Sequence, residues 1–545
     1  MRPLALSLAL SLVGPLARAQ TPPSQGPRRP PGDEMAALDR EPYRDAPGVT
    51  PIAEPLRDTA ATRDTRVRIE GFLRTRGDLA HNWGLGVGPG PSGTALWPMP
   101  YSDSTRRTQT NLDTRLRLDA HAEIGYGVSL HGRIHALDNL RWGSTPDADF
   151  AGAVVTQRSP DRPVDLRQLY GQVLLPFGML SVGRMGALVD WGTGFFVNAG
   201  NGLDDDFGDV GDRIAFTAPL AGLLWTAMYE VSAAGPGVNA IRPDIRPDFD
   251  LDGRDDVRTA ALAISRYDLP ATRQRRLRAG RDTFNMGLVG SYRWQEIDLA
   301  PGAVPGARTA IQRDLSAFTL DAWARIDLGR VTVEAEVAYL GFDIANASLD
   351  PAARLDIALT GRQLGGVARV DWRQGQRFFA RMEFGFASGD DRPGFGARPT
   401  ATAQARPGDV DGPQFDLTAR PADANVNNFR FHPNYRIDLI LWRRLVGTVT
   451  DAWYLRPMAR YRLGSMFTIE GAVIASVAME GNSTPSGSKP LGVETNVGLI
   501  YEQEHGFVAR LDYGLLVPLA GFRDVVRRVD PEVAQAVHLV MAWRY

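Results

Sequence analysis

Hydrophobic and polar residues alternate along most of the chain from Arg66 onward. In residues 111–124 (NLDTRLRLDAHAEI), the even-numbered positions are mostly aliphatic and the odd-numbered positions are mostly charged. A period of two residues predicts a β-strand with one apolar and one polar face. The same alternation marks eighteen candidate strands, at 66–78, 111–124, 128–140, 165–174, 179–188, 212–218, 222–231, 257–266, 284–296, 315–328, 331–344, 362–373, 377–388, 451–462, 465–479, 493–502, 507–517 and 534–545.

Three features favour a membrane barrel over a soluble β-sandwich. Many candidate strands run for about 10–14 residues, which exceeds the roughly 5–6 residues usual in sheets and suffices for a tilted strand to cross a bilayer. Charged residues recur in the middle of the polar faces, as they do in a water-filled lumen. Short turns alternate with long polar loops. Aromatic residues near strand ends would also suit the interfacial girdles of such a barrel, namely Tyr126, Phe177, Trp142, Trp191 and Tyr501. We therefore predict an all-β fold, a transmembrane antiparallel up-and-down barrel over residues 66–545, with short periplasmic turns and long extracellular loops.

The connections leave the strand count open at two places. Residues 267–283 form a long, Arg-rich connection on the short-turn side, so sixteen strands is an alternative to about eighteen. Residues 435–445 (YRIDLILWRRL) resemble a strand, but a nineteenth strand would break the even number of bacterial barrels. We expect instead a structured loop segment, within 389–450, that folds into the pore.

The N-terminus predicts export. Arg2, the apolar run 4–13 and Ala17-Arg18-Ala19 form a secretory signal peptide over residues 1–19. Residues 20–65 are rich in Pro and charge without apolar periodicity, which predicts a disordered periplasmic segment. We expect the mature protein in the outer membrane of a Gram-negative bacterium, in contact with its lipid and lipopolysaccharide.

Composition excludes several functions. The net charge of -2 argues against a nucleic-acid binder, which would carry a basic excess. The absence of Cys excludes disulfides, thiolate metal sites and Cys nucleophiles. No compact nucleophile–base motif is present, so we expect no enzyme.

The chain ends on an alternating segment that closes with an aromatic residue. Trp543 and Tyr545 share one face of residues 534–545. This ending resembles the C-terminal signal that the barrel-assembly machinery reads on outer-membrane substrates. We expect that machinery to be a partner during biogenesis.

Several phrases resemble a family of large, mostly uncharacterised outer-membrane barrels. They are Leu175-Pro176-Phe177-Gly178, residues 200–209 (GNGLDDDFGD) and residues 384–390 (FGFASGD). The Ala-Ser-Gly-Asp phrase is also similar to one in alginate-export-type, substrate-specific porins. The resemblance implies an outer-membrane channel and names no solute.

Charged residues on the polar faces are the candidate pore lining. Such charges set pore selectivity, but they also neutralise one another in a barrel wall, and both interpretations stand. The candidates are Arg115, Arg117, Asp119, His121, His131, Arg133, Asp321, Arg325, Glu334, Glu336, Arg381, Glu383, Arg456, Arg460, Glu470, Arg510 and Asp512.

Two further patterns are candidate metal ligands. If residues 124 and 128 pair, His121 lies opposite His131 with Glu123 nearby, and imidazoles are common metal ligands. Residues 248–253 (DFDLDG) open like a calcium loop, although Thr259 stands where a bidentate acid is expected. No cofactor is required, and Ca²⁺ is the candidate ligand of the loop acids Asp248, Asp250, Asp252, Asp204, Asp206 and Asp209.

Two functions follow from these patterns. The first is a porin-like channel for diffusion or export of polar or charged solutes, with residues 389–450 forming its constriction. The alternative is a closed structural or adhesion barrel whose calcium-ordered loops bind a surface partner. Bulky inward residues such as Trp323 and Phe379 would favour the closed barrel.

Overall fold

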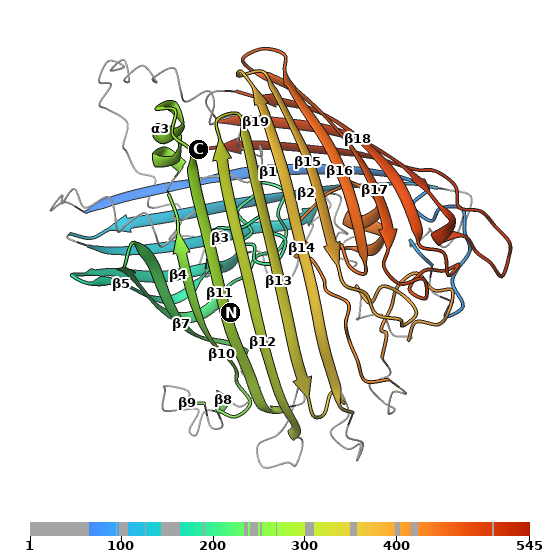
Figure 1. Ribbon diagram of the computed structural model, residues 1–545, viewed down its shortest axis with the longest axis horizontal. Helices are drawn as coiled ribbons and strands as arrows, with labels where there is room; N and C mark the ends of the chain where they lie inside the picture. The colour runs from blue at the N-terminus through green and yellow to red at the C-terminus, as the bar shows by residue number, and fades with distance from the viewer. Residues whose placement is uncertain are drawn as a thin grey trace, which may run out of the picture. The chain divides into compact units, whose positions relative to one another are not determined.

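The computed structural model contains a closed β-barrel (Figure 1). It describes residues 65–93, 95–97, 107–125, 127–142, 164–187, 189, 191–233, 238–239, 249–250, 253–268, 270–299, 310–348, 357–397, 404–415, 423–503 and 506–545. All of these belong to one compact unit, residues 41–545. The predicted signal peptide and nearly all of the predicted Pro-rich segment lie outside the described residues, as do Tyr126, Asp248 and Asp252.

Eighteen strands form the barrel wall, so the alternative of sixteen is wrong. Each strand pairs antiparallel with its neighbours in the chain, and β1 pairs with β20 to close the sheet. The strands are β1 (Arg66–His81), β2 (Thr108–Glu123), β3 (Val128–Arg141), β4 (Val164–Leu175), β5 (Gly178–Met185), β6 (Gly211–Leu220), β7 (Leu223–Ala233), β10 (Val257–Arg266), β11 (Thr283–Leu299), β12 (Ala310–Leu328), β13 (Val331–Ile344), β14 (Leu359–Gln374), β15 (Phe378–Ala387), β16 (Ala452–Arg462), β17 (Phe467–Ala478), β18 (Pro490–Glu502), β19 (Phe507–Pro518) and β20 (Ala534–Arg544).

The long connection between β10 and β11 contains a helix, α3 (Pro270–Arg278), rather than a missing strand. Two of its arginines bind carboxylates outside the helix, Arg276 with Asp268 just before it at 2.8 Å and Arg273 with Asp327 on β12 at 3.5 Å. A two-strand hairpin, β8 (Val238–Asn239) with β9 (Phe249–Asp250), lies in the connection between β7 and β10. Among the described residues, no helix is long and apolar enough to cross a membrane.

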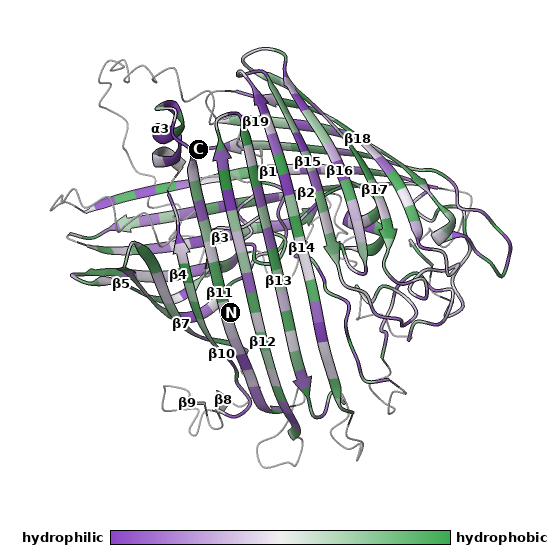
Figure 2. Cartoon of the chain, in the orientation of Figure 1, coloured by the Kyte–Doolittle hydropathy of each residue, from purple (hydrophilic) through white to green (hydrophobic). Residues whose placement is uncertain are grey.

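The wall has an inverted distribution of polarity, because its charged side chains are buried and its apolar side chains are exposed. Arg74 and Arg117 are 0% and 1% exposed, whereas Ile214 and Leu499 are 53% and 42% exposed. Hydrophobic and hydrophilic residues alternate along the strands in Figure 2. This is the pattern of a barrel whose outer face meets lipid and whose inner face is polar.

The predicted aromatic belt at the strand ends needs one correction. Phe177 and Trp142 are exposed near strand ends, as an interfacial belt requires. Trp191, which the sequence placed in the same belt, is instead buried inside the barrel and stacks on Trp323 of β12 at 5.6 Å between ring centroids. The reason is that the chain after β5 turns into the lumen.

Candidate pore interior

Two segments between strands fold into the barrel. The first inner segment, residues 191–210, follows β5, and the second inner segment, residues 423–451, follows β15. The first reaches the wall through the backbone N–H of Thr193, which donates to Glu336 on β13, and through the Leu203 carbonyl, which accepts from Arg74 on β1 at 3.0 Å. The second contains a π-helix, η1 (Leu441–Val446), so residues 435–445 are a structured loop segment and not a strand.

Two buried carboxylates hold η1 in place. Glu494 on β18 accepts hydrogen bonds from the backbone N–H groups of Leu439, Ile440 and Leu441 at 2.8–3.1 Å. Asp438 accepts hydrogen bonds from the backbone N–H groups of Trp442 and Arg443, at 2.9 and 3.0 Å. These are backbone donors at the start of a helix, which have no partner within the helix itself. Burial raises the pKa of Asp438 to about 6.

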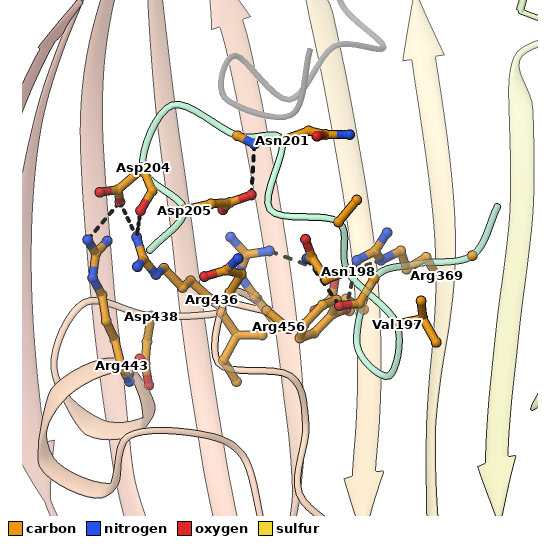
Figure 3. Close-up of a pocket in the computed structure, with 18 of the residues that line it drawn as sticks. Val197, Asn198, Asn201, Asp204, Asp205, Arg369, Arg436, Asp438, Arg443 and Arg456 are labelled. Carbon is orange, nitrogen blue, oxygen red and sulfur yellow. Dashed lines mark hydrogen bonds and ion pairs between the residues drawn. The ribbon is translucent and has the colours of Figure 1, made fainter. Parts of the chain in front are cut away.

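Asp204 joins the two inner segments to each other and to the wall. Its carboxylate contacts Arg436 and Arg443 of the second inner segment, each at 2.7 Å (Figure 3). It also contacts Arg76 on β1 at 3.1 Å and His538 on β20 at 3.3 Å. Burial opposes ionisation of Asp204, but Arg436 and Arg443 outweigh it and hold its pKa well below the ordinary value.

Some of the acids predicted to bind calcium on loops lie inside the barrel instead. Asp204 and Asp206 are not at the tip of an extracellular loop but inside the barrel, where Asp206 contacts Arg76 at 2.9 Å and Arg436 at 2.8 Å. Asp209 accepts from the backbone N–H of Asn198 at 2.7 Å. Asp250 lies in β9, and its side chain is outside the described residues. Within the described part of the chain, the carboxylates that cluster at metal-ligand spacing are Asp390, Asp391 and Asp423, all within 4.8 Å of one another.

A cavity of about 470 Å³ remains between the inner segments and the wall. Its lining carries six arginines and six carboxylates, namely Arg369, Arg436, Arg443, Arg456, Arg460 and Arg510 with Asp204, Asp205, Glu383, Asp438, Glu470 and Asp512. Figure 3 shows Arg369, Arg436, Arg443 and Arg456 around this space. The cavity therefore presents both signs of charge in equal number.

Most wall charges from the sequence prediction point inward and contact one another. Asp119 accepts from Arg117 at 2.7 Å and from Arg133 at 2.6 Å across the β2–β3 hairpin. Other contacts of 2.5–3.3 Å join Arg115 to Asp206, Arg325 to Asp327, Arg381 to Asp371, Arg460 to Glu470, Arg510 to Asp512 and Arg510 to Glu470. Glu383 binds Arg369 at 3.0 Å and Arg456 at 3.8 Å. Mutual neutralisation therefore accounts for much of this charge.

Asp321 is an exception to this pairing. It is 1% exposed, and neither oxygen of its carboxylate has a hydrogen-bond partner among the described residues. It pairs with Ala338 in the register of β12 and β13, so Glu336 is its diagonal neighbour on the inner face. Glu334, the next acid on β13, accepts from the indole N–H of Trp323 at 2.9 Å.

Part of the interior is filled by an apolar core. Phe195 of the first inner segment contacts Phe429, Phe431 and Tyr435 of the second, with ring centroids 4.8–6.4 Å apart. Trp442 in η1 is 1% exposed and donates to Ser476 on β17 at 2.9 Å. The wall residues Trp323 and Phe379 are also buried. The inner segments therefore fold as a compact hydrophobic cluster inside a polar wall.

Sequence reasoning missed the first inner segment and three arginines, Arg369, Arg436 and Arg443. One signal was available. The inward faces of β1 to β3 carry a cluster of arginines, namely Arg74, Arg76, Arg115, Arg117 and Arg133. The wall acids Asp113, Asp119 and Asp138 bind these groups, and Arg74, Arg76 and Arg115 also contact Asp204 or Asp206 from inside the barrel.

No protein-family model and no curated protein matches the chain. Among solved structures, it is similar to OccK9 (OpdG) of Pseudomonas aeruginosa, at 13% identity and a TM-score of 0.45 over 88% of this chain and 98% of that one. It is also similar to the structure of P. aeruginosa OpdK with vanillate, at 10% identity and a TM-score of 0.43 over 89% of this chain and 99% of that one. A third similar structure is that of the outer membrane channel DcaP of Acinetobacter baumannii, at 11% identity and a TM-score of 0.39 over 89% of this chain and 100% of that one.

Proposed function

We propose that the protein is a porin-like channel of the bacterial outer membrane that passes small polar solutes by diffusion. The observation that carries this proposal is the cavity of about 470 Å³ inside a wall whose inner face is charged. A barrel of this strand number is wide enough for an aqueous path unless segments fill it. The two inner segments narrow that path, so the constriction is built from both rather than from residues 389–450 alone.

The balance of charge in the cavity lining favours the passage of solutes that carry charges of both signs or a dipole. Six arginines face six carboxylates in the cavity, and most are joined by contacts that fix their positions. Rings of one sign of charge make a pore selective for the opposite ion, and this lining has no such ring among its described residues. We therefore expect weak preference between small cations and anions.

The test is single-channel recording of the purified protein in planar bilayers with a KCl gradient. We expect discrete conductance steps and a reversal potential near zero. A strongly selective pore would contradict the balanced lining, although it would still be a channel.

A second recording separates a narrow channel from a closed barrel. In the double variant Arg436→Gln/Arg443→Gln, the second inner segment loses its charged contacts with Asp204, so the conductance should rise. The matched control is Arg107→Gln, which removes a largely exposed ion pair with Glu532. Absence of any conductance in the wild type and in the double variant would exclude the channel.

The alternative function is a closed structural or adhesion barrel, and the apolar cluster of the inner segments favours it. Phe195, Phe431 and Trp442 are almost fully buried inside the barrel, as a plug would be. This function predicts that deleting long loops abolishes surface binding and leaves membrane permeability unchanged. Calcium at the loop acids belongs to the same proposal.

A further inference from the structure

Two histidines face each other at the short-turn end of the barrel interior. His121 on β2 and His131 on β3 are partners in the strand register, and their Nδ1 atoms lie 3.0 Å apart. The ring centroids are 4.4 Å apart with 70° between the planes. This distance is shorter than the centroid distance expected if the two imidazoles met end to end, with both ring axes along the line between the Nδ1 atoms. The rings therefore meet at an angle, with both nitrogens on the same side.

The outer nitrogen of each ring has its own partner. His121 Nε2 is 3.4 Å from a carboxylate oxygen of Glu123, and His131 Nε2 is 2.9 Å from the Ser129 hydroxyl. A carboxylate accepts hydrogen bonds, so it favours the proton of His121 on Nε2 and leaves Nδ1 as a lone pair. In the metal-free protein one Nδ1 must donate to the other across their 3.0 Å hydrogen bond, so His131 carries its proton on Nδ1 and its Nε2 accepts from the Ser129 hydroxyl. A bound metal ion would displace that proton, and the Ser129 hydroxyl could then accept from His131 Nε2. This arrangement, in which the distal nitrogen donates to an oxygen, is the usual support of a metal-bound histidine.

The neighbouring strands fix the position of the pair. Tyr170 on β4 stacks on His131 with 4.6 Å between centroids and 4° between planes. His131 is 1% exposed, and the side chain of His121 is 16% exposed. Arg68 on β1 lies opposite His121 in the register, but its guanidinium is bound to Glu70 at 3.0 Å. Two carboxylates, Glu70 and Glu123, therefore offset one cation around the pair.

The spacing of the two Nδ1 atoms discriminates between metals. Metal–imidazole bonds measure about 2.0–2.1 Å, so nitrogens 3.0 Å apart subtend an angle of about 91–97° at a shared ion. That angle fits adjacent positions of a tetragonal ion better than the wider angle of tetrahedral Zn²⁺. Tetragonal nitrogen–oxygen sites are typical of Cu²⁺ and Ni²⁺, and Cu²⁺ binds such ligands most tightly among the first-row divalent ions.

We propose that His121 and His131 bind a divalent transition-metal ion, preferentially Cu²⁺, through their two Nδ1 atoms, with water completing the coordination. Glu123 and Ser129 are positioning residues that orient the rings. The site does not depend on the proposed channel, because neither histidine lines the central cavity, although Tyr170, which stacks on His131, does.

The test is a Cu²⁺ titration of the purified, folded barrel, followed by electron paramagnetic resonance and by competition with a chelator of known affinity. The expected result is one Cu²⁺ per barrel with hyperfine coupling to two nitrogens. His121→Gln and His131→Gln should each remove one nitrogen coupling and weaken binding. Glu123→Gln should weaken binding by about 10-fold while keeping both nitrogens.

The matched control is His81→Gln, since His81 lies at the far end of β1 and contacts the Thr108 hydroxyl at 2.8 Å. It should leave Cu²⁺ binding unchanged. Gel mobility before and after heating shows whether each variant is folded. The proposal is wrong if the wild type binds no Cu²⁺, if the two histidine variants retain its affinity, or if the bound ion shows no nitrogen coupling. Tighter binding of Zn²⁺ than of Cu²⁺ would overturn the tetragonal geometry.

Discussion

At the scale of single residues, the interior of this barrel holds charges that ordinary protein cores exclude. Arg74, Arg115 and Arg117 are at most 2% exposed, yet each has carboxylates or carbonyls within hydrogen-bond distance. Burying an ion is costly unless it is paired and hydrogen-bonded. The positions of these arginines are therefore tied to the positions of their acidic partners.

Asp451, just outside β16, is a buried acid without such a partner. It adopts a positive φ of 47°, one oxygen accepts from the Glu480 N–H at 3.0 Å, and the Ser483 side chain is its other polar neighbour. Burial, together with Glu480 and Asp390 nearby, raises its pKa from 3.8 to about 7. The folded state therefore holds a proton that the unfolded chain releases between these values. Its contribution to stability is full at low pH and declines as the pH rises toward 7.

We predict that Asp451→Asn raises the thermal unfolding midpoint at pH 8 and changes it little at pH 4. Asn is neutral at every pH, and it tolerates a positive φ. Thermal unfolding followed by circular dichroism at both pH values measures the effect. Asp282→Asn, on an exposed acid, is the control and should show no such pH dependence. Equal midpoint shifts at the two pH values would contradict the role of ionisation.

At the scale of elements, the two inner segments have little regular secondary structure and depend on contacts with the wall. Hydrogen bonds from backbone N–H groups to the carboxylates of Glu494 and Asp438 hold the start of η1, and Asp204 connects both segments to β1 and β20. A loop of this kind is held in place by its side-chain contacts rather than by regular backbone hydrogen bonds within the loop. Loss of one central contact should loosen both segments together.

We predict that Asp204→Asn lowers the free energy of unfolding by about 3–5 kcal/mol, because it leaves buried arginines without their carboxylate. Denaturant unfolding followed by tryptophan fluorescence measures this change. Asp343→Asn is the matched control, since it removes an ion pair with Arg362 that is more than half exposed, and it should cost less than about 1 kcal/mol. Equal effects of the two substitutions would show that Asp204 does not hold the segments.

At the scale of the whole molecule, closure of the sheet satisfies every strand edge. β20 pairs with β19 on one side and with β1 on the other, so the last strand completes the barrel. Within lipid, unpaired backbone groups are too costly to leave exposed, which is why spanning sheets close. The C-terminal strand is thus needed both for closure and, by our expectation, for recognition during assembly.

We predict that Trp543→Ser/Tyr545→Ser lowers the amount of barrel in the outer membrane several-fold while leaving refolding in detergent nearly unchanged. Both side chains are about half exposed, at 44% and 54%, and the Tyr545 hydroxyl donates one hydrogen bond to the Arg117 carbonyl at 3.0 Å, so together they contribute modestly to stability. Gel mobility of heated and unheated membrane fractions measures the folded fraction. Tyr461→Ser is the control, because Tyr461 is similarly exposed near the end of another strand. Equal loss in cells and in detergent would assign the effect to stability instead of recognition.

The local alternation of apolar and polar residues was sufficient to predict the barrel itself. The two-residue period places Leu499 outside and Arg117 inside without reference to any distant residue, and the hairpin at Gly329-Arg330 sets the register by which Arg325 pairs with Glu334. The pairing of His121 with His131 followed from the same rule, because neighbours across a short turn are fixed by counting. These features depend on contacts between residues close in sequence.

The sequence indicated that a segment within 389–450 enters the pore, but the entry of the first inner segment and the contacts inside the lumen were decided only by the tertiary structure. Asp204 contacts residues 128, 232, 239 and 334 positions away, at Arg76, Arg436, Arg443 and His538. No period or turn rule links positions so distant, and the burial of Trp191 depends on the same path of the chain. The sequence by itself therefore determined an eighteen-strand membrane barrel with a charged inner face. Folding in three dimensions determined how the inner segments fill it, because that arrangement rests on long-range pairing of charges and aromatic rings.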